Sequence, residues 1–175
     1  VNLACFNNGA GEIDLTINGG TSPFSPSWTG PNGFTSNSED LIALDSGAYL
    51  ISGFDDNGCP IPDFTYNVTQ PDTIILSLSS TETACDAPTG TSIVSAVGGL
   101  VSVDYSYVWT NATGDTVGLS NEVTGLDVGL YSVEVTDDNG CVSIGNVNIS
   151  QLSGPSITLD AINPVDCAGN QTGSI

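Results

Sequence analysis

Two pentapeptides in this sequence place carboxylates and a thiol close together. Residues 55–59 and residues 137–141 both read Asp-Asp-Asn-Gly-Cys, and the two copies lie 82 residues apart. Neighbouring carboxylates and an amide carbonyl are the hard oxygen ligands that calcium takes, and paired carboxylates can also hydrolyse glycosidic bonds. The cysteines can form disulfides or bind metals. The rest of the sequence has to decide among these chemistries.

The Asn-Gly pair in each pentapeptide favours a structural interpretation. It lies between two strand-like segments, and Asn-Gly accepts the positive φ values of a tight hairpin. The aspartates before it would then cap the turn by accepting its backbone N–H groups. The alternative is a calcium site, although neither pentapeptide has the spacing or the terminal glutamate of an EF-hand loop. The candidate ligands of that minor hypothesis are Asp55, Asp56, Asp137 and Asp138.

The missing residue types argue against catalysis. The chain contains no Lys, Arg or His. It therefore has no imidazole for general acid–base work and no cationic side chain to stabilise an oxyanion or a phosphate. A glycosidase needs two carboxylates across a cleft, and carboxylates at hairpin tips are not expected to face one. We predict that the chain is not an enzyme and has no catalytic or cofactor-binding residues.

The pentapeptides belong to a longer internal repeat. Residues 47–59 align with residues 129–141 without a gap, and Trp28 aligns with Trp109. Three cysteines, Cys5, Cys85 and Cys167, each precede an isoleucine by eight residues. A fixed period of this kind is typical of tandem arrays. The repeat predicts two units of about 80 residues, 1–71 and 72–153, followed by the first part of a truncated third unit, 154–175.

The repeat makes disulfide pairing inside each unit the simplest interpretation. Cys5 with Cys59 and Cys85 with Cys141 would close similar loops of 54 and 56 residues. The main rival is pairing across units, Cys59 with Cys85. Metal binding is less favoured, because there is no CxxC motif and no histidine. Cys167 is left unpaired because its unit is truncated, and disulfides imply an oxidising compartment outside the cytoplasm.

The composition excludes several partners. The formal net charge is −20, so the chain has no cation with which to bind nucleic acid or anionic lipid. At 39% apolar residues it is not composed like a disordered acidic segment. No apolar run approaches 18 residues, so direct membrane insertion is not expected.

The hydrophobic pattern is that of β-strands throughout. Segments such as residues 12–19 and residues 131–137 alternate apolar and polar side chains, which indicates one buried and one solvated face. Gly, Pro, Asn and Asp separate these segments at short intervals, as in antiparallel sandwiches. The predicted fold class is all-β, with tandem Ig-like antiparallel β-sandwich repeats of about 80 residues. The predicted core residues are Trp28, Tyr49 and Phe54 in the first unit and Trp109, Tyr131 and Val133 in the second.

The repeated residues resemble the SprB-type repeat of Bacteroidetes gliding-motility cell-surface adhesins. In the second unit the resemblance is carried by Gly98-Gly99, Trp109, Gly125-Leu126, Gly129, Tyr131, Val133, Val135-Thr136-Asp137, Asn139-Gly140-Cys141 and Gln151. In the first unit it is carried by Gly19-Gly20, Trp28, Gly47, Tyr49, Asp55, Asn57-Gly58-Cys59 and Gln70-Pro71. The resemblance implies a very large protein that leaves the cell by type IX secretion and forms surface filaments. The family offers no catalytic residues to transfer.

Two non-enzymatic functions fit these observations. In the first, the chain is a repetitive stalk segment of a large secreted adhesin filament at the extracellular cell surface, linked to gliding motility and surface attachment. Its partners would be neighbouring repeats of the same chain, surface polysaccharide or other filament chains. In the alternative, each unit is a carbohydrate-binding module of an exported protein, with Phe34, Phe64 or Tyr107 stacking on sugar rings. Those aromatic residues do not recur at matching positions, which favours the stalk.

Overall fold

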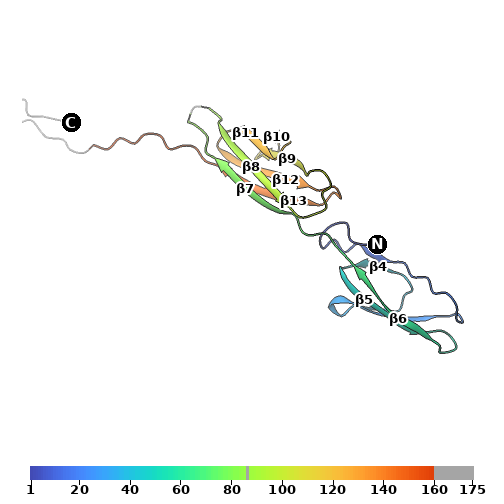
Figure 1. Cartoon of the computed structure of the whole chain (residues 1–175). Helices are drawn as coiled ribbons and strands as arrows, with labels where there is room; N and C mark the ends of the chain where they lie inside the picture. Colours follow the sequence, from blue (N-terminus) through green and yellow to red (C-terminus); the bar gives the residue numbers. More distant parts are fainter. Residues whose placement is uncertain (86, 160–175) are drawn as a thin grey trace, which may run out of the picture.

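The computed structural model describes residues 1–85 and 87–159, and strands dominate them (Figure 1). A 3₁₀ turn, η1 (Pro31–Gly33), follows the second strand. The described part of the chain contains no helix that is long and apolar enough to cross a membrane. The strands of the first unit are β1 (Gly11–Ile13), β2 (Ser25–Thr29), β3 (Thr35–Ser36), β4 (Leu41–Leu44), β5 (Gly47–Phe54) and β6 (Pro60–Val68).

The second unit is a sandwich of two antiparallel sheets. One sheet has the strand order β11-β8-β7 and the other has the order β10-β9-β12-β13. The buried side chains of both sheets form one cluster around Trp109. The strands are β7 (Ile75–Thr81), β8 (Gly90–Val97), β9 (Ser106–Asn111), β10 (Thr116–Gly118), β11 (Glu122–Leu126), β12 (Gly129–Thr136) and β13 (Val142–Ile149).

The strand arrangement of the second unit is Ig-like. In immunoglobulin lettering, β7, β8 and β11 take the places of strands A, B and E, and β9, β12 and β13 take those of C, F and G. A tyrosine near the start of β5 and of β12 marks the same fold in both units. The hydroxyl of Tyr131 donates a hydrogen bond to the carbonyl of Asp127 at 3.2 Å, and Tyr49 donates to Asp45 at 3.0 Å. This is the tyrosine corner of such sandwiches.

The first unit repeats this arrangement apart from one strand. Its sheets have the orders β1-β4 and β3-β2-β5-β6, so the counterpart of β7 is the missing strand. Figure 1 shows the two units lying end to end, joined by the linker between β6 and β7, residues 69–74.

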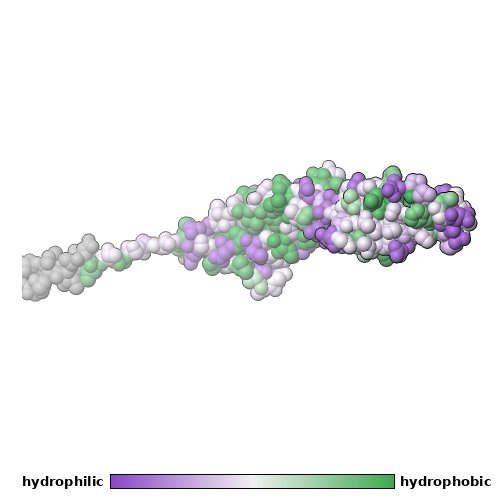
Figure 2. Space-filling model, turned by 90° about the horizontal axis from the view of Figure 1, so that it is seen from below, coloured by the Kyte–Doolittle hydropathy of each residue, from purple (hydrophilic) through white to green (hydrophobic). Residues whose placement is uncertain are grey.

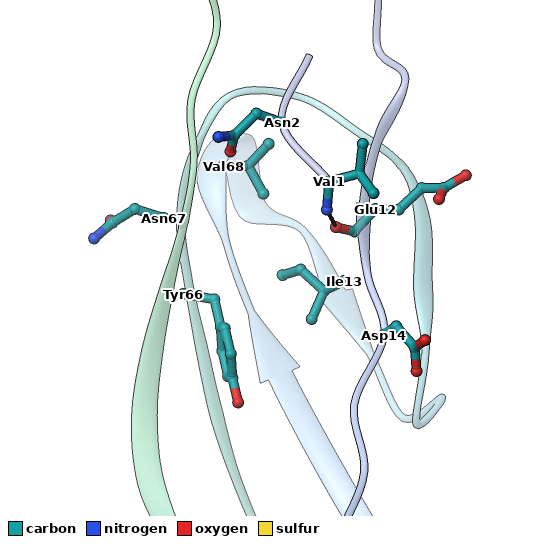
Figure 3. A pocket seen from close by; sticks show the side chains of 8 residues that line it. All are labelled: Val1, Asn2, Glu12, Ile13, Asp14, Tyr66, Asn67 and Val68. Atoms are coloured by element: carbon teal, nitrogen blue, oxygen red, sulfur yellow. Dashed lines mark hydrogen bonds between the residues drawn. The ribbon is translucent and has the colours of Figure 1, made fainter. Parts of the chain in front are cut away.

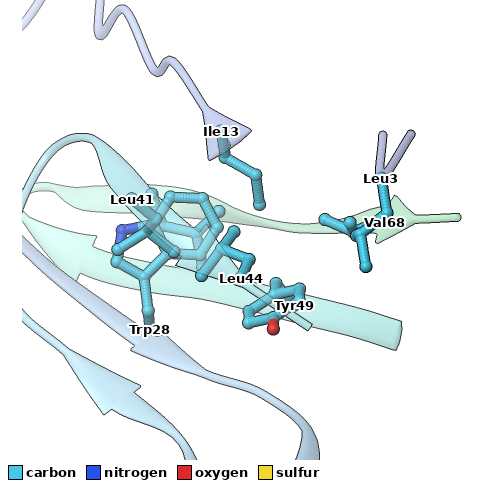
Figure 4. Close-up of a cluster of buried hydrophobic side chains, with 8 residues drawn as sticks. Leu3, Ile13, Trp28, Leu41, Leu44, Tyr49 and Val68 are labelled. Atoms are coloured by element: carbon cyan, nitrogen blue, oxygen red, sulfur yellow. The ribbon is translucent and has the colours of Figure 1, made fainter. Parts of the chain in front are cut away.

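Each unit has its own core, and the two tryptophans occupy equivalent places. Trp28 and Trp109 are both fully buried, and each indole N–H donates to a backbone carbonyl at 2.9 Å. The acceptors are Ser38 and Ser120, which lie 82 residues apart. The predicted burial of both tryptophans is therefore confirmed. Figure 4 shows the first core, formed by Leu3, Ile13, Trp28, Leu41, Leu44, Tyr49, Ile51 and Val68.

Two sequence-based placements are wrong. Phe54 was expected in the first core but is 57% exposed, because the inward positions of β5 are the odd-numbered Tyr49 and Ile51. Ile13 was matched with Ile93, but the strand registers match it with Ser92, which is buried while Ile93 is exposed. The second unit has one residue fewer between its first cysteine and its strand. Residues at equal intervals from Cys5 and Cys85 therefore lie on opposite faces of β1 and β8.

The strand predicted for residues 12–19 ends early. Only Gly11–Ile13 pairs with β4. The backbone N–H of Leu15 donates instead to the carboxylate of Asp40 at 3.0 Å. A side-chain acceptor of this kind competes with ladder hydrogen bonds, so the chain leaves the sheet at this point.

Candidate functional site: the junction between the units

A single aspartate organises the hairpin of the first unit. The carboxylate of Asp55 is largely buried and accepts three backbone N–H groups, from Asn57 at 3.0 Å, Cys59 at 2.8 Å and Thr21 at 2.9 Å. The first two bonds close the turn, and the third holds the loop that follows Gly20. Hydrogen bonds from the N–H groups of Cys59 and Thr21 hold the pKa of Asp55 below its usual value.

The second unit contains the same clamp. Asp137 accepts N–H groups from Asn139 and Cys141 at 2.9 Å and from Leu100 at 2.8 Å. The structural interpretation of both pentapeptides, a hairpin turn, is confirmed by the bond from Gly140 N–H to the Asp137 carbonyl and its counterpart from Gly58 to Asp55.

The turn geometry differs from the expected one. Positive φ occurs at Gly58 (76°) and Gly140 (80°), whereas neither preceding asparagine has it. Two hydrogen bonds join Asp55 and Cys59 across the three residues between them. The N–H of Asp55 donates to the carbonyl of Cys59, and the N–H of Cys59 donates to the carboxylate of Asp55. This pattern matches a three-residue hairpin loop that ends in a left-handed glycine, rather than the two-residue Asn-Gly turn.

Three of the four candidate calcium ligands, Asp55, Asp137 and Asp138, accept hydrogen bonds from protein groups. Asp56 is exposed. Asp138 accepts hydrogen bonds from the hydroxyl and the N–H of Ser102, and these bonds lower its pKa. Within residues 1–85 and 87–159, the structure gathers no group of three or more His, Cys, Asp or Glu side chains that could hold a metal ion. The calcium hypothesis therefore gains no ligand set from this geometry.

The disulfide joins the two units instead of closing either one. Cys5 is bonded to Cys141, 136 residues away, with a Cα–Cα distance of 5.5 Å. The predicted pairs Cys5–Cys59 and Cys85–Cys141 are wrong, and Cys59 and Cys85 are exposed free thiols. Cys167 lies outside the described residues.

The length of a strand explains why pairing inside a unit fails. Cys59 directly precedes β6, whereas Cys5 lies beside the residues that follow β6, where Leu3 N–H bonds the Thr69 carbonyl at 2.9 Å. Nine strand residues span about 30 Å, at about 3.3 Å per residue. A disulfide requires Cα atoms within about 7 Å. The two cysteines of one unit therefore lie at opposite ends of it.

Direct contacts surround the disulfide at the junction. The side-chain amide of Asn139 donates to the carbonyl of Ala4 at 2.9 Å, and Gly99 N–H donates to the carbonyl of Asp72 in the linker at 2.9 Å. A cavity of about 290 Å³ lies at the same place, lined by residues of the N-terminal segment, the linker and the second hairpin. Ala4 and Asn139 were not predicted as junction residues, although the repeated Ala-Cys at 4–5 and 84–85 was a usable signal.

A second hollow lies on the first unit, between β1 and β6 (Figure 3). Its volume is about 270 Å³, and Ile13, Tyr66 and Val68 contribute to its wall. In the second unit β7 pairs with β8 and packs beside β13, the counterparts of β1 and β6. The hollow therefore lies at the place in the first unit that β7 takes in the second.

The aromatic residues considered for sugar stacking do not form one platform. Phe34 packs edge-on against Tyr49 with ring centroids 5.3 Å apart, as part of the core. Phe64 is 57% exposed and leans on Tyr66 at 4.6 Å. Tyr107 is half-buried in the other unit, and burial together with the charge of Asp104 raises its pKa.

The strands and the junction define an all-β protein made of Ig-like sandwich units joined end to end. Residues 1–33 match the family model described as SprB repeat, which confirms the predicted resemblance over that segment. Among solved structures, the amphioxus IgVJ-C2 molecule is similar at 12% identity and a TM-score of 0.36, covering 86% of this chain and 98% of that chain. Those values are too low to carry any inference between the two. A comparison with curated proteins found no match.

Proposed function

We propose that this chain is a repetitive stalk segment of a large secreted cell-surface adhesin filament, linked to gliding motility and surface attachment. The observation that carries the proposal is the junction, where the Cys5–Cys141 disulfide and the linker both connect the two units. Two connections at one junction restrict bending far more than one flexible linker does. A spacer that holds a distal binding region away from a cell needs this restriction.

The cellular location supports the same function. A disulfide indicates an extracytoplasmic location, because cytoplasmic thiols are kept reduced. The SprB match at residues 1–33 is consistent with a repeat of a surface adhesin. The type IX export route is part of the proposal and rests on the resemblance. The absence of catalysis is also part of it and rests on the missing Lys, Arg and His.

The uniform negative charge favours an extended array. The net charge is −20, and charges of the same sign on neighbouring units repel within a Debye length of about 8 Å at physiological salt. Repulsion opposes both folding back of the array and lateral bundling. Bundling should therefore become easier at high salt.

The test is small-angle X-ray scattering on arrays made by adding copies of residues 72–153 to the chain, at low and high salt and with and without calcium. The proposal predicts a maximum dimension that grows linearly with the number of units. A compact particle at every condition contradicts it. Micromolar binding of a glycan by each single unit, measured by calorimetry, would favour the carbohydrate-binding alternative.

A further inference from the structure

The two free thiols of the described chain lie at opposite ends of the two-unit body. Cys59 is in the hairpin of the first unit, at the end away from the second unit. Cys85 lies beside the residues that follow β13, where the chain leaves the second unit: its Sγ atom is 3.3 Å from the carbonyl oxygen of Leu152. Both are exposed and available to a neighbouring molecule or unit.

Cys85 occupies the same environment as the bonded Cys5. Two residues before each cysteine, a backbone N–H donates to a carbonyl just beyond the last strand, Leu3 to Thr69 and Thr83 to Ser150, both at 2.9 Å. The following glutamine also contacts the cysteine segment in both units: Gln70 accepts the Asn7 N–H, and Gln151 donates to the Cys85 carbonyl. Cys85 is therefore presented at the end of its unit as Cys5 is.

Cys59 occupies the same environment as the bonded Cys141. Both cysteines donate their N–H to the clamping aspartate of their own hairpin, at 2.8 Å and 2.9 Å. The asparagine two residues before each cysteine differs between the bonded and the free hairpin in its hydrogen-bond partner. Asn139 donates to Ala4 of the first unit at 2.9 Å, whereas Asn57 donates to Thr21 of its own unit at 2.8 Å. Ala84 precedes Cys85 as Ala4 precedes Cys5.

We propose that Cys59 and Cys85 are the sites of further inter-unit disulfides, so that each unit's first cysteine bonds the hairpin cysteine of the unit that follows. Cys85 would bond the hairpin cysteine of the next unit, and Cys59 the first cysteine of the preceding one. This inference rests on the proposed tandem array. The result is a ladder with one disulfide at every junction.

The bond forms by oxidation of two thiols to one disulfide. The pair loses two protons and two electrons, and a protein disulfide of the thiol oxidoreductase class accepts them and becomes a dithiol. The exchange passes through a mixed disulfide, which needs an accessible thiol, and both cysteines are exposed.

The test completes the third unit of the chain. Residues 93–153 are appended directly after Ile175. Ile175 follows Cys167 by eight residues, as Ile13 follows Cys5, and the strand registers place Ile13 at the position of Ser92. Ile175 is therefore the equivalent of Ser92, and the next residue of the unit is number 93. The protein is refolded in a glutathione redox buffer and digested without reduction by a protease that cleaves before aspartate. Cys85 then lies in peptide 72–85, native Cys141 lies in 138–159, and the appended copy of Cys141 lies in a shorter peptide that ends at the new C-terminus.

The proposal predicts two disulfides, Cys5 with native Cys141 and Cys85 with the appended cysteine, and free thiols at Cys59 and Cys167. Cys85→Ser should free the appended thiol and leave the first disulfide intact, while the matched control Cys59→Ser should change neither. Cys85 bonded to native Cys141, Cys59 or Cys167 overturns the proposal. A free Cys85 alongside an intact Cys5–Cys141 bond also overturns it and leaves the stalk proposal, which scattering tests, untouched.

Discussion

Asp55 shows how one carboxylate fixes a local structure and its response to pH. The sequence points to this residue and predicts either a turn or a calcium site for it. It could not choose the three N–H donors, because Thr21 comes from a loop 34 residues away. The side chain lies at the start of the hairpin and holds both the turn and that loop, so its charge contributes to folding.

Asp55→Asn should lower the stability of the first unit at neutral pH. The folded state lowers the pKa of Asp55, so the stabilisation is complete above the unfolded-state pKa of about 3.9. It is lost as the pH falls through the lower folded-state value. The difference in denaturation midpoint between wild type and variant should therefore shrink as the pH falls from about 5 to about 2.

The matched control for this prediction is Asp56→Asn. It makes the same change of net charge next to the clamp, at an exposed side chain. Equal effects of the two substitutions, or a difference between Asp55→Asn and wild type that does not depend on pH, would contradict the assigned role.

Tyr131→Phe tests the tyrosine corner. The variant keeps the buried ring and removes the hydroxyl that donates to the Asp127 carbonyl at 3.2 Å. Loss of one such hydrogen bond should cost about 1 kcal/mol in the free energy of unfolding. Tyr107→Phe is the control, since its hydroxyl makes no hydrogen bond to the described residues. An equal loss in both variants, measured by urea denaturation, would exclude a special role for the corner.

At the scale of elements, the repeat period and the alternation of apolar and polar residues were sufficient to predict the strands near the repeated pentapeptides. The strand expected within residues 131–137 is present as part of β12, and its partner β13 follows the hairpin. Alternation could not reveal a shift of one residue, which is why Ile93 was misplaced. It also could not show that the two cysteines of one unit lie at opposite ends of that unit. This separation determines which cysteines can pair.

Gly98 should tolerate a side chain less well than its counterpart Gly19. Both have positive φ, 94° and 83°, so alanine costs about 1 kcal/mol of backbone strain at either position. At Gly98 a Cβ would also lie 2.0 Å from the carbonyl oxygen of Thr73 in the linker, whereas at Gly19 nothing lies within 4 Å. The linker must then move, at a further cost of about 1–3 kcal/mol.

The measurement is hydrogen exchange resolved by unit. Gly98→Ala should increase exchange in the second unit and in residues 69–74 more than Gly19→Ala does in the first unit. If the two variants lose equal protection in their own units, the linker does not pack on the Gly98 loop as the structure describes.

At the scale of the whole molecule, the surface is less uniform than the charge suggests. Figure 2 shows hydrophobic residues gathered over the second unit, while hydrophilic residues cover more of the first unit's far end. The exposed apolar side chains of the second unit include Ile75, Val97, Val142 and Ile144, on β7, β8 and β13. The composition gave the net charge but not this distribution, because it depends on which face each strand turns to solvent.

The disulfide ladder has a mechanical consequence for the whole array. In a complete ladder, two covalent threads run along the array, each an alternation of inter-unit disulfides and chain segments. Each chain segment, such as residues 59–85, crosses two units before it reaches the next disulfide. That segment holds β6, the linker and β7, which are already extended strands. Its 26 peptide steps can reach only about 90 Å. Tension therefore bypasses the remainder of each sandwich.

Single-molecule force spectroscopy on an array of six or more units should detect this bypass. Under reducing conditions each unit should unfold separately and release about 250 Å, which is the extended length of roughly 80 residues less the folded length. Under oxidising conditions those steps should vanish, because the disulfides carry the load past residues 86–140. Substituting both ladder cysteines of one central unit by serine should restore long steps at that position alone. Full-length steps in the oxidised wild-type array would show that the threads are not continuous, and the ladder would then be wrong even if isolated junction disulfides form.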